Sequence, residues 1–134
     1  MLENKKVLIT GGTGSLGSAL TERLLETGVD AIRIYSRDEL KQTQMETKFN
    51  DKRLRFLIGD IRDKARLEKA VEDINIVIHT AALKQVPVIE YNPFEAIKTN
   101  VQGAQNLVDA CLEKDVEFAL AIGTDKAVSP FNTY

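Results

Sequence analysis

The segment that decides the fold is residues 6–17, which read KVLITGGTGSLG. Lys6–Thr10 is a short run of mainly apolar and β-branched residues, and this composition predicts a strand. A glycine-rich turn follows, and Ser15–Thr27 then carries apolar residues at helical spacing, with Gly28 placed to end the helix. A strand, a glycine-rich turn and an amphipathic helix in this order are typical of a dinucleotide-binding fold.

The alternation of strand and helix continues along the chain. Further strands are predicted over Ala31–Ser36, Leu54–Ile58, Ile74–His79 and Glu117–Ile122. Further helices are predicted over 38–48, 63–72 and 92–114, the last with Val101, Leu107, Val108 and Cys111 facing inward. Five such alternations predict an α/β fold, a doubly wound Rossmann-like parallel sheet of order 3-2-1-4-5. We expect residues 1–134 to form one cofactor-binding domain that stops after the fifth strand.

The composition fits one folded domain and excludes several classes of protein. The chain has 134 residues, of which 43% are hydrophobic and 28% charged, which suffices for a core and excludes a disordered chain. A net charge of −2 argues against nucleic-acid binding through a basic face. No apolar run reaches the roughly 20 residues of a membrane span, and MLENKKVLIT at residues 1–10 lacks the apolar stretch expected of a signal peptide. We therefore expect a cytoplasmic protein with Cys111 reduced in its core, and we assign no metal site.

The glycine-rich turn is the first chemical signal. Its glycines allow a tight exit from the strand, a close approach to a pyrophosphate and tight packing of the helix on the sheet. The amino end of the helix offers free N–H groups and the positive end of its dipole to the phosphates. Glycines that only make a turn are the alternative, but the strand–turn–helix context favours a nucleotide. The glycines that carry this signal are Gly11, Gly14 and Gly17.

The end of the second predicted strand bears on which dinucleotide is bound. A carboxylate there would accept hydrogen bonds from the ribose hydroxyls of NAD, whereas Ser36 and Arg37 offer a hydroxyl and a guanidinium that suit the 2′-phosphate of NADP. Lys41, one helical turn on, adds charge, while Asp38 and Glu39 keep NAD possible. On the chemistry of this turn we favour NADP.

The third predicted strand closes with Gly59-Asp60-Ile61-Arg62-Asp63. Asp60 is a candidate acceptor for the adenine amino group, and Ile61 is a candidate to pack on the ring. A helix-capping role is the alternative for Asp60, but Asp63 is better placed as a cap. His79, the one histidine, closes a core strand, so we expect it to pack rather than react.

Several stretches together resemble the extended short-chain dehydrogenases/reductases, in their nucleotide-sugar branch. The glycine loop, Gly59–Asp63 and His79-Thr80-Ala81-Ala82 carry this resemblance. YSRDELKQ from Tyr35, ALKQVP from Ala82, EYNP from Glu90 and GTDKA from Gly123 are similar to the polysaccharide-biosynthesis dehydratases. Within these, the sequence is most similar to enzymes that invert UDP-N-acetylglucosamine at C5 during 4,6-dehydration, and the similarity runs along the whole chain.

The resemblance implies roles for individual residues. Those that would line the pyrophosphate are Thr13, Gly14, Ser15 and Leu16, and those that would meet the adenosine-phosphate end are Ser36, Arg37, Asp38, Glu39, Leu40 and Lys41. In such enzymes NADP takes a hydride from C4 of the sugar, water leaves from C5–C6, and the hydride returns at C6. Asp125 matches the acid that protonates the departing hydroxyl, Lys126 the base at C5, and Tyr134 the tyrosine that deprotonates the C4 hydroxyl. A loop ion pair is the alternative for Asp125 and Lys126. The residues that would border the nicotinamide half are Thr80, Ala81, Lys84, Ile122 and Gly123.

The resemblance also implies a longer enzyme. The lysine that partners the catalytic tyrosine lies beyond Tyr134, so we expect the 134-residue chain to be inactive as a dehydratase, while the adenosine half of the cofactor site is complete. A UDP-sugar is the implied substrate. A homo-oligomer is implied as well, because these enzymes often pair through helices beside the fifth strand. A stand-alone NADP-binding module and a related UDP-sugar dehydratase-epimerase stay open as alternatives.

Overall fold

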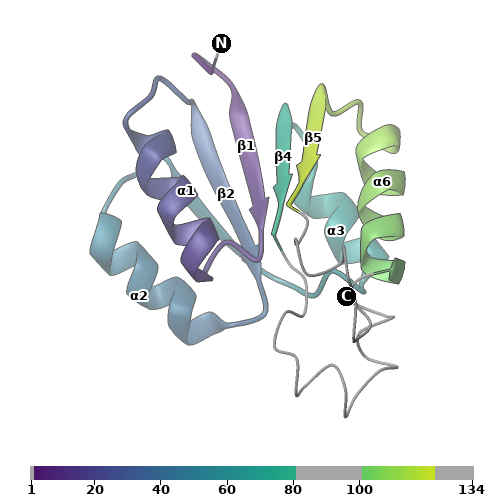
Figure 1. Ribbon diagram of the computed structural model, residues 1–134, viewed down its shortest axis with the longest axis horizontal. Helices are drawn as coiled ribbons and strands as arrows, with labels where there is room; N and C mark the ends of the chain where they lie inside the picture. The colour runs from purple at the N-terminus through teal and green to yellow at the C-terminus, as the bar shows by residue number, and fades with distance from the viewer. Residues whose placement is uncertain (1, 81–100, 123–134) are drawn as a thin grey trace, which may run out of the picture.

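The computed structural model describes residues 2–80 and 101–122, and these form a parallel sheet with helices on both faces (Figure 1). The strands are β1 (Lys6–Thr10), β2 (Ala31–Ser36), β3 (Leu54–Ile58), β4 (Ile76–His79) and β5 (Phe118–Ala121). The helices are α1 (Ser15–Leu25), α2 (Glu39–Phe49), α3 (Lys64–Ala70) and α6 (Gly103–Glu113). The strand order is β3-β2-β1-β4-β5, so the predicted fold and order are confirmed.

Two apolar layers hold the helices on the sheet. In Figure 1, α1 and α2 lie on one side of the sheet and α3 and α6 on the other. Alternate residues of β1 supply both layers, because successive side chains of a strand point to opposite faces. Val7 and Ile9 join the core cluster of Leu24 and Met45, while Leu8 joins the cluster that reaches α3 and α6. Cys111 belongs to this second cluster, as predicted, and burial raises the pKa of its thiol.

The predicted bounds are correct for β1, β2 and β3 and differ by a few residues elsewhere. α1 ends at Leu25, before the predicted Thr27, and Gly28 is not what stops it. The hydroxyl of Thr27 donates to the Leu24 carbonyl at 2.6 Å, and the Arg53 guanidinium donates to the Leu25 carbonyl at 2.7 Å. These two side chains satisfy carbonyls that the end of a helix leaves free. The start of the helix predicted over 92–114 lies outside the described residues.

The buried faces of α1 and α6 each include a glycine, and part of the inward face predicted for α6 is exposed. α1 buries Gly17, Thr21 and Leu24, while Leu16 is 39% exposed. α6 buries Gly103, Leu107, Ala110 and Cys111, whereas Val101 and Val108, predicted to face inward, are 61% and 52% exposed. Gly17 of α1 and Gly103 of α6 lie on these buried faces, where an added Cβ would lie 2.5 Å from Gly12 and 2.7 Å from Ile61.

Arg53 provides a test of how α1 is terminated. Its guanidinium donates to the carbonyls of Leu25 and Thr27 and pairs with Asp51 at 3.0 Å. Arg53→Met leaves these carbonyls without their donor, so we expect the free energy of unfolding to fall by about 1–2 kcal/mol in urea titrations. Arg23→Met is the control, because Arg23 is 83% exposed and its 3.8 Å contact with Glu26 contributes little. Equal effects of the two substitutions would contradict the capping role of Arg53.

Candidate functional site

Four loops meet at the carboxyl ends of the strands. The register pairs Thr10 of β1 with Tyr35 and His79, and Ser36 of β2 with Ile58, so these strands end at one edge of the sheet. Because all strands are parallel, the glycine loop and the turns after β2, β3 and β4 leave from that same edge. In open α/β sheets this edge is where ligands bind.

The glycine loop is shaped by two close contacts. Gly11 has a φ of 66°, a left-handed conformation that favours glycine, and its N–H donates to the Tyr35 carbonyl at 2.8 Å. A Cβ on Gly17 would lie 2.5 Å from Cα of Gly12, so only glycine lets the first turn of α1 sit against the loop. Among the described residues, a Cβ on Gly14 would meet nothing closer than the Gly11 carbonyl at 3.5 Å. The loop is therefore packed on its inner side and open at Gly14.

The first turn of α1 presents backbone donors at this opening. Gly14 is the N-cap residue of α1, and because glycine has no side chain the first turn has no side-chain cap. The Gly14 carbonyl accepts a hydrogen bond from the Ser18 N–H. The N–H groups at the start of a helix have no partner within the helix. Together with the helix dipole they favour an anion such as a phosphate. Thr13 is half-buried, and Ser15 and Leu16 are exposed beside them.

The turn after β2 combines one nearly buried hydroxyl with exposed charges. Ser36 is 8% exposed, and its Oγ accepts a hydrogen bond from Gln42 Nε2 at 3.0 Å. Asp38 caps α2 by accepting from the Lys41 N–H at 3.0 Å, so its carboxylate has a structural role. The side chains of Arg37, Glu39, Leu40 and Lys41 are exposed.

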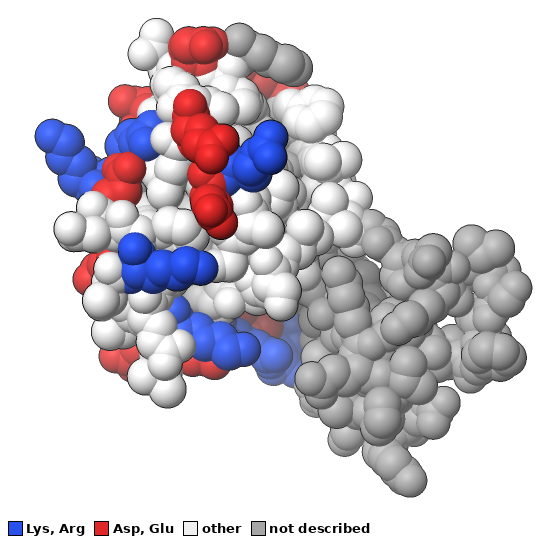
Figure 2. Space-filling model, turned by 60° about the vertical axis from the view of Figure 1, so that its left-hand side comes forward, with Lys and Arg blue, Asp and Glu red and all other residues white. Residues whose placement is uncertain are grey.

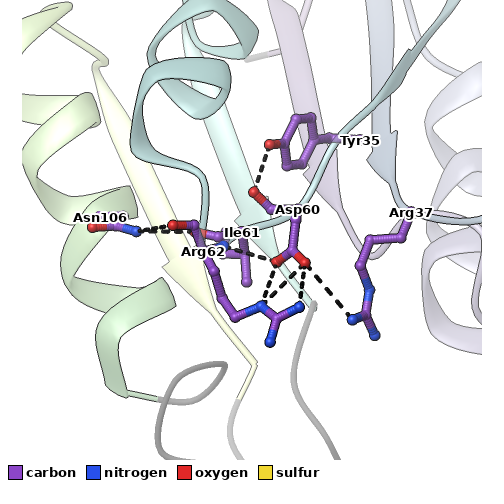
Figure 3. Close-up of polar contacts among 6 residues, drawn as sticks. All are labelled: Tyr35, Arg37, Asp60, Ile61, Arg62 and Asn106. Carbon is purple, nitrogen blue, oxygen red and sulfur yellow. Dashed lines mark hydrogen bonds and ion pairs between the residues drawn. The ribbon is translucent and has the colours of Figure 1, made fainter. Parts of the chain in front are cut away.

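An acidic group with two basic partners lies at the turn after β3 (Figure 3). The Arg62 guanidinium contacts Asp60 at 2.7 Å, and Arg37 reaches the same carboxylate at 3.8 Å. Burial acts to raise the pKa of Asp60, but hydrogen bonds from the side chain and N–H of Arg62, with the charges of Arg62 and Arg37, outweigh it and lower the pKa. Asp60 is therefore ionised at neutral pH and acts only as an acceptor.

The turn after β3 is anchored on both sides by side chains that the sequence reasoning missed. Tyr35 donates from its hydroxyl to the Asp60 carbonyl at 2.8 Å, and Asn106 of α6 donates to the carbonyls of Ile61 and Arg62 at 3.2 Å each (Figure 3). Ile61 is 5% exposed, and a Cβ on Gly103 would lie 2.7 Å from it. Ile61 is thus chiefly a core residue that α6 contacts closely. Asn106 could have been found from the sequence, because it is a polar residue on the inner stripe of an amphipathic helix.

Thr80 and His79 tie the end of β4 to the glycine loop. The Thr80 hydroxyl donates to the Thr10 carbonyl at 2.6 Å, and Thr10 Oγ1 lies 2.6 Å from His79 Nδ1. His79 is 8% exposed and packs, as predicted. Ile122, placed beside the nicotinamide by the resemblance, donates its N–H to the His79 carbonyl at 3.0 Å.

The remaining predicted site residues lie outside the described residues: Ala81, Lys84, Gly123, Asp125, Lys126 and Tyr134. Within residues 2–80 and 101–122, no group of acidic, histidine and cysteine side chains is arranged to hold a metal ion. No helix in the same ranges has the length and apolar character needed to cross a bilayer. On the face shown in Figure 2, basic and acidic side chains are interspersed.

The sheet order and the glycine loop define a Rossmann-like α/β protein. The chain belongs to the family described as "Polysaccharide biosynthesis protein", whose sequence profile matches residues 7–134. It is 55% identical over 135 residues to the UDP-N-acetylglucosamine 4,6-dehydratase (inverting) of Campylobacter jejuni strain 81-176, covering all of this chain and 40% of that protein. It is 45% identical to the UDP-glucose 4-epimerase of Rickettsia rickettsii, covering 98% of this chain and 40% of the epimerase.

Solved structures share the fold. The structure of Pen from Bacillus thuringiensis matches with a TM-score of 0.97 and 40% identity over the whole chain, which corresponds to 41% of Pen. DesIV, a dTDP-glucose 4,6-dehydratase from Streptomyces venezuelae solved with NAD and TYD bound, matches with a TM-score of 0.75 and 27% identity. That match covers 85% of this chain and 38% of DesIV. The chain thus spans about 40% of the length of the relatives it resembles.

Two glycine substitutions separate the packed side of the loop from its open side. Gly17→Ala places a Cβ against the backbone of Gly12, which cannot yield as a flexible side chain would, so we expect the free energy of unfolding to fall by about 1–3 kcal/mol. Gly14→Ala meets no such contact and should cost less than about 1 kcal/mol, the range of N-cap effects. Urea unfolding followed by circular dichroism measures both. A larger loss for Gly14→Ala would contradict this assignment of the two sides.

Proposed function

We propose that this chain binds NADP at the carboxyl edge of its sheet and serves as the cofactor-binding part of a nucleotide-sugar 4,6-dehydratase. The observation that carries the proposal is the glycine loop, closed against α1 at Gly17 and open at Gly14, directly before the uncapped first turn of the helix. This arrangement suits the pyrophosphate of a dinucleotide. The phosphate-binding residues in the proposal are Gly11, Thr13, Gly14, Ser15, Leu16 and Gly17.

The choice of NADP over NAD rests on the turn after β2. The carboxylate of Asp38, the side chain that would suit an NAD ribose, is engaged as the cap of α2. Arg37 is 58% exposed in a 3.8 Å ion pair with Asp60, and exposed pairs of this kind contribute only about 0–1 kcal/mol. Its guanidinium is therefore available to a phosphate at the ribose 2′ position. NAD is the alternative, and the NAD bound to DesIV supports a nicotinamide cofactor in general.

The adenine is proposed to lie at the turn after β3. An ionised Asp60 accepts from the adenine amino group, and Ile61 contributes backbone and the small exposed part of its side chain to the ring contact. Thr80 and Ile122 lie at the ends of β4 and β5, where the nicotinamide half would follow, with Ala81, Lys84 and Gly123 assigned beside them. The anchoring by Tyr35 and Asn106 holds this turn in place before any ligand arrives.

The proposed substrate is UDP-N-acetylglucosamine, with inversion at C5. The 55% identity to the Campylobacter enzyme over the full chain supports this choice. When bound, the nicotinamide ring supplies a hydride acceptor for C4 and a donor for C6. Tyr134 removes the proton of the C4 hydroxyl, Lys126 takes the C5 proton, and Asp125 donates to the departing C6 hydroxyl. Asp125 must be protonated and Lys126 neutral to act in this way, which requires burial or bound ligands to shift both pKa values.

A second candidate is a UDP-sugar epimerase. The 45% identity to the Rickettsia UDP-glucose 4-epimerase favours it, since the cofactor chemistry at C4 is shared and only the fate of the C4 ketone differs. Proton NMR of UDP-N-acetylglucosamine incubated with the longer enzyme of which this chain is the proposed cofactor-binding part separates the two, because dehydration produces a C6 methyl signal and epimerisation does not. A cytoplasmic location and a homo-oligomeric assembly belong to the same proposal.

Calorimetric titration with NADP and NAD tests the cofactor assignment. We expect the chain to bind NADP more tightly than NAD, and Arg37→Met to weaken NADP about tenfold while changing NAD little, because only NADP carries the 2′-phosphate. Arg23→Met is the matched control: it removes the same charge from an exposed position on α1. Tighter binding of NAD by the unaltered chain would contradict the assignment to NADP, and binding of neither would overturn the proposed function.

A further inference from the structure

Gln42 is a buried polar residue in the first turns of α2, and the proposed site gives it no contact with the cofactor. It is 5% exposed. Its Nε2 lies 3.0 Å from Ser36 Oγ and 3.1 Å from the Leu57 carbonyl oxygen. Gln42 therefore links α2 to the ends of β2 and β3, directly beneath the turn that begins with Arg37.

The Leu57 contact determines which way the Gln42 amide faces. A carbonyl oxygen only accepts hydrogen bonds, so the amide atom that meets Leu57 must be the nitrogen, and this same nitrogen meets Ser36 Oγ. Gln42 is thus the donor and the serine oxygen is the acceptor. A serine hydroxyl carries one hydrogen besides its lone pairs, and that hydrogen must point away from Gln42.

The hydroxyl hydrogen of Ser36 has no acceptor within residues 2–80 and 101–122. Ser36 is only 8% exposed, so a donor without a partner there is costly unless a ligand or water accepts from it. Ser36 ends β2 at the ligand-binding edge of the sheet, one residue before Arg37. An incoming acceptor at this position meets a hydroxyl already oriented as a donor.

We propose that Gln42 is a positioning residue for cofactor choice, because it holds the Ser36 hydroxyl as a donor toward a phosphate on the ribose 2′ oxygen. The inference rests on the proposed dinucleotide binding and deepens it. A phosphate offers only acceptors, so it matches a fixed donor and the Arg37 guanidinium together. A free 2′ hydroxyl, as in NAD, is matched best by a carboxylate. The nearby carboxylate of Asp38 is already engaged as the cap of α2, so it does not offer this match.

Two substitutions at Gln42 test the inference by titration calorimetry with NADP and NAD. Gln42→Met removes the donor at similar volume, so the Ser36 hydroxyl is no longer fixed as an acceptor from Gln42 and its hydrogen is free to take other orientations. Gln42→Glu places acceptors where the donor was. We expect the ratio of NADP to NAD affinity to fall about threefold to tenfold in the first variant and at least as far in the second. Thermal denaturation of each variant reports whether the fold is retained.

Gln44→Glu is the matched control for charge. Gln44 is an exposed residue of the same helix, so Gln44→Glu adds the same charge away from Ser36. We expect the ratio of NADP to NAD affinity of this variant to change by less than about twofold. Ser36→Ala is the control for mechanism. In that background Gln42→Met should leave the ratio unchanged, because there is no hydroxyl left to orient.

The outcomes separate this inference from the proposed function. A fall in the ratio that disappears in the Ser36→Ala background supports the role of Gln42. A purely structural role would weaken NADP and NAD equally, and an unchanged ratio in Gln42→Met and Gln42→Glu would overturn the inference while dinucleotide binding stood. Binding of neither dinucleotide by the unaltered chain would overturn both.

Discussion

The contact between Gly17 and Gly12 is the constraint on which the rest of the site depends. A Cβ at Gly17 would lie 2.5 Å from Cα of Gly12, so α1 reaches its place on the sheet only because Gly17 lacks a side chain. This close packing holds the amino end of α1 at the edge where β1, β2, β3 and β4 end (Figure 1). Backbone donors of the helix and the side chains of the neighbouring turns are thereby brought to one place.

Side chains that bind backbone carbonyls keep those turns in shape. Gln42 reaches Leu57, Tyr35 reaches Asp60, Asn106 reaches Ile61 and Arg62, and Thr80 reaches Thr10. Burial, followed by the nearby carboxylates of Asp63 and Asp60, raises the pKa of Tyr35, so its hydroxyl stays a donor. Preformed turns of this kind reduce the entropy that ligand binding would otherwise cost.

Sequence reasoning succeeded where a signal is local and failed where a partner is distant. The apolar runs of β1, β2 and β3 predicted their bounds, and regular alternation predicted the sheet order. Val108 was misplaced because Gly103, not a large apolar residue, lies on the face of α6 that packs closely, against Ile61. Asn106 was missed because the Ile61 carbonyl that it binds lies 45 residues earlier in the chain, and the local apolar pattern does not indicate contacts between residues so far apart in sequence.

The most direct test of the account is the titration of the ¹⁵N-labelled chain with NADP, followed by amide chemical shifts. The account predicts that the perturbed amides fall in residues 13–16, 36–41 and 60–61, at the carboxyl ends of β1, β2 and β3. The surface hollow lined in part by Asn50, Lys52 and Phe56, at the opposite end of β3, should stay unchanged. Perturbations centred on that hollow, with the glycine loop unaffected, would contradict the placement of the cofactor site.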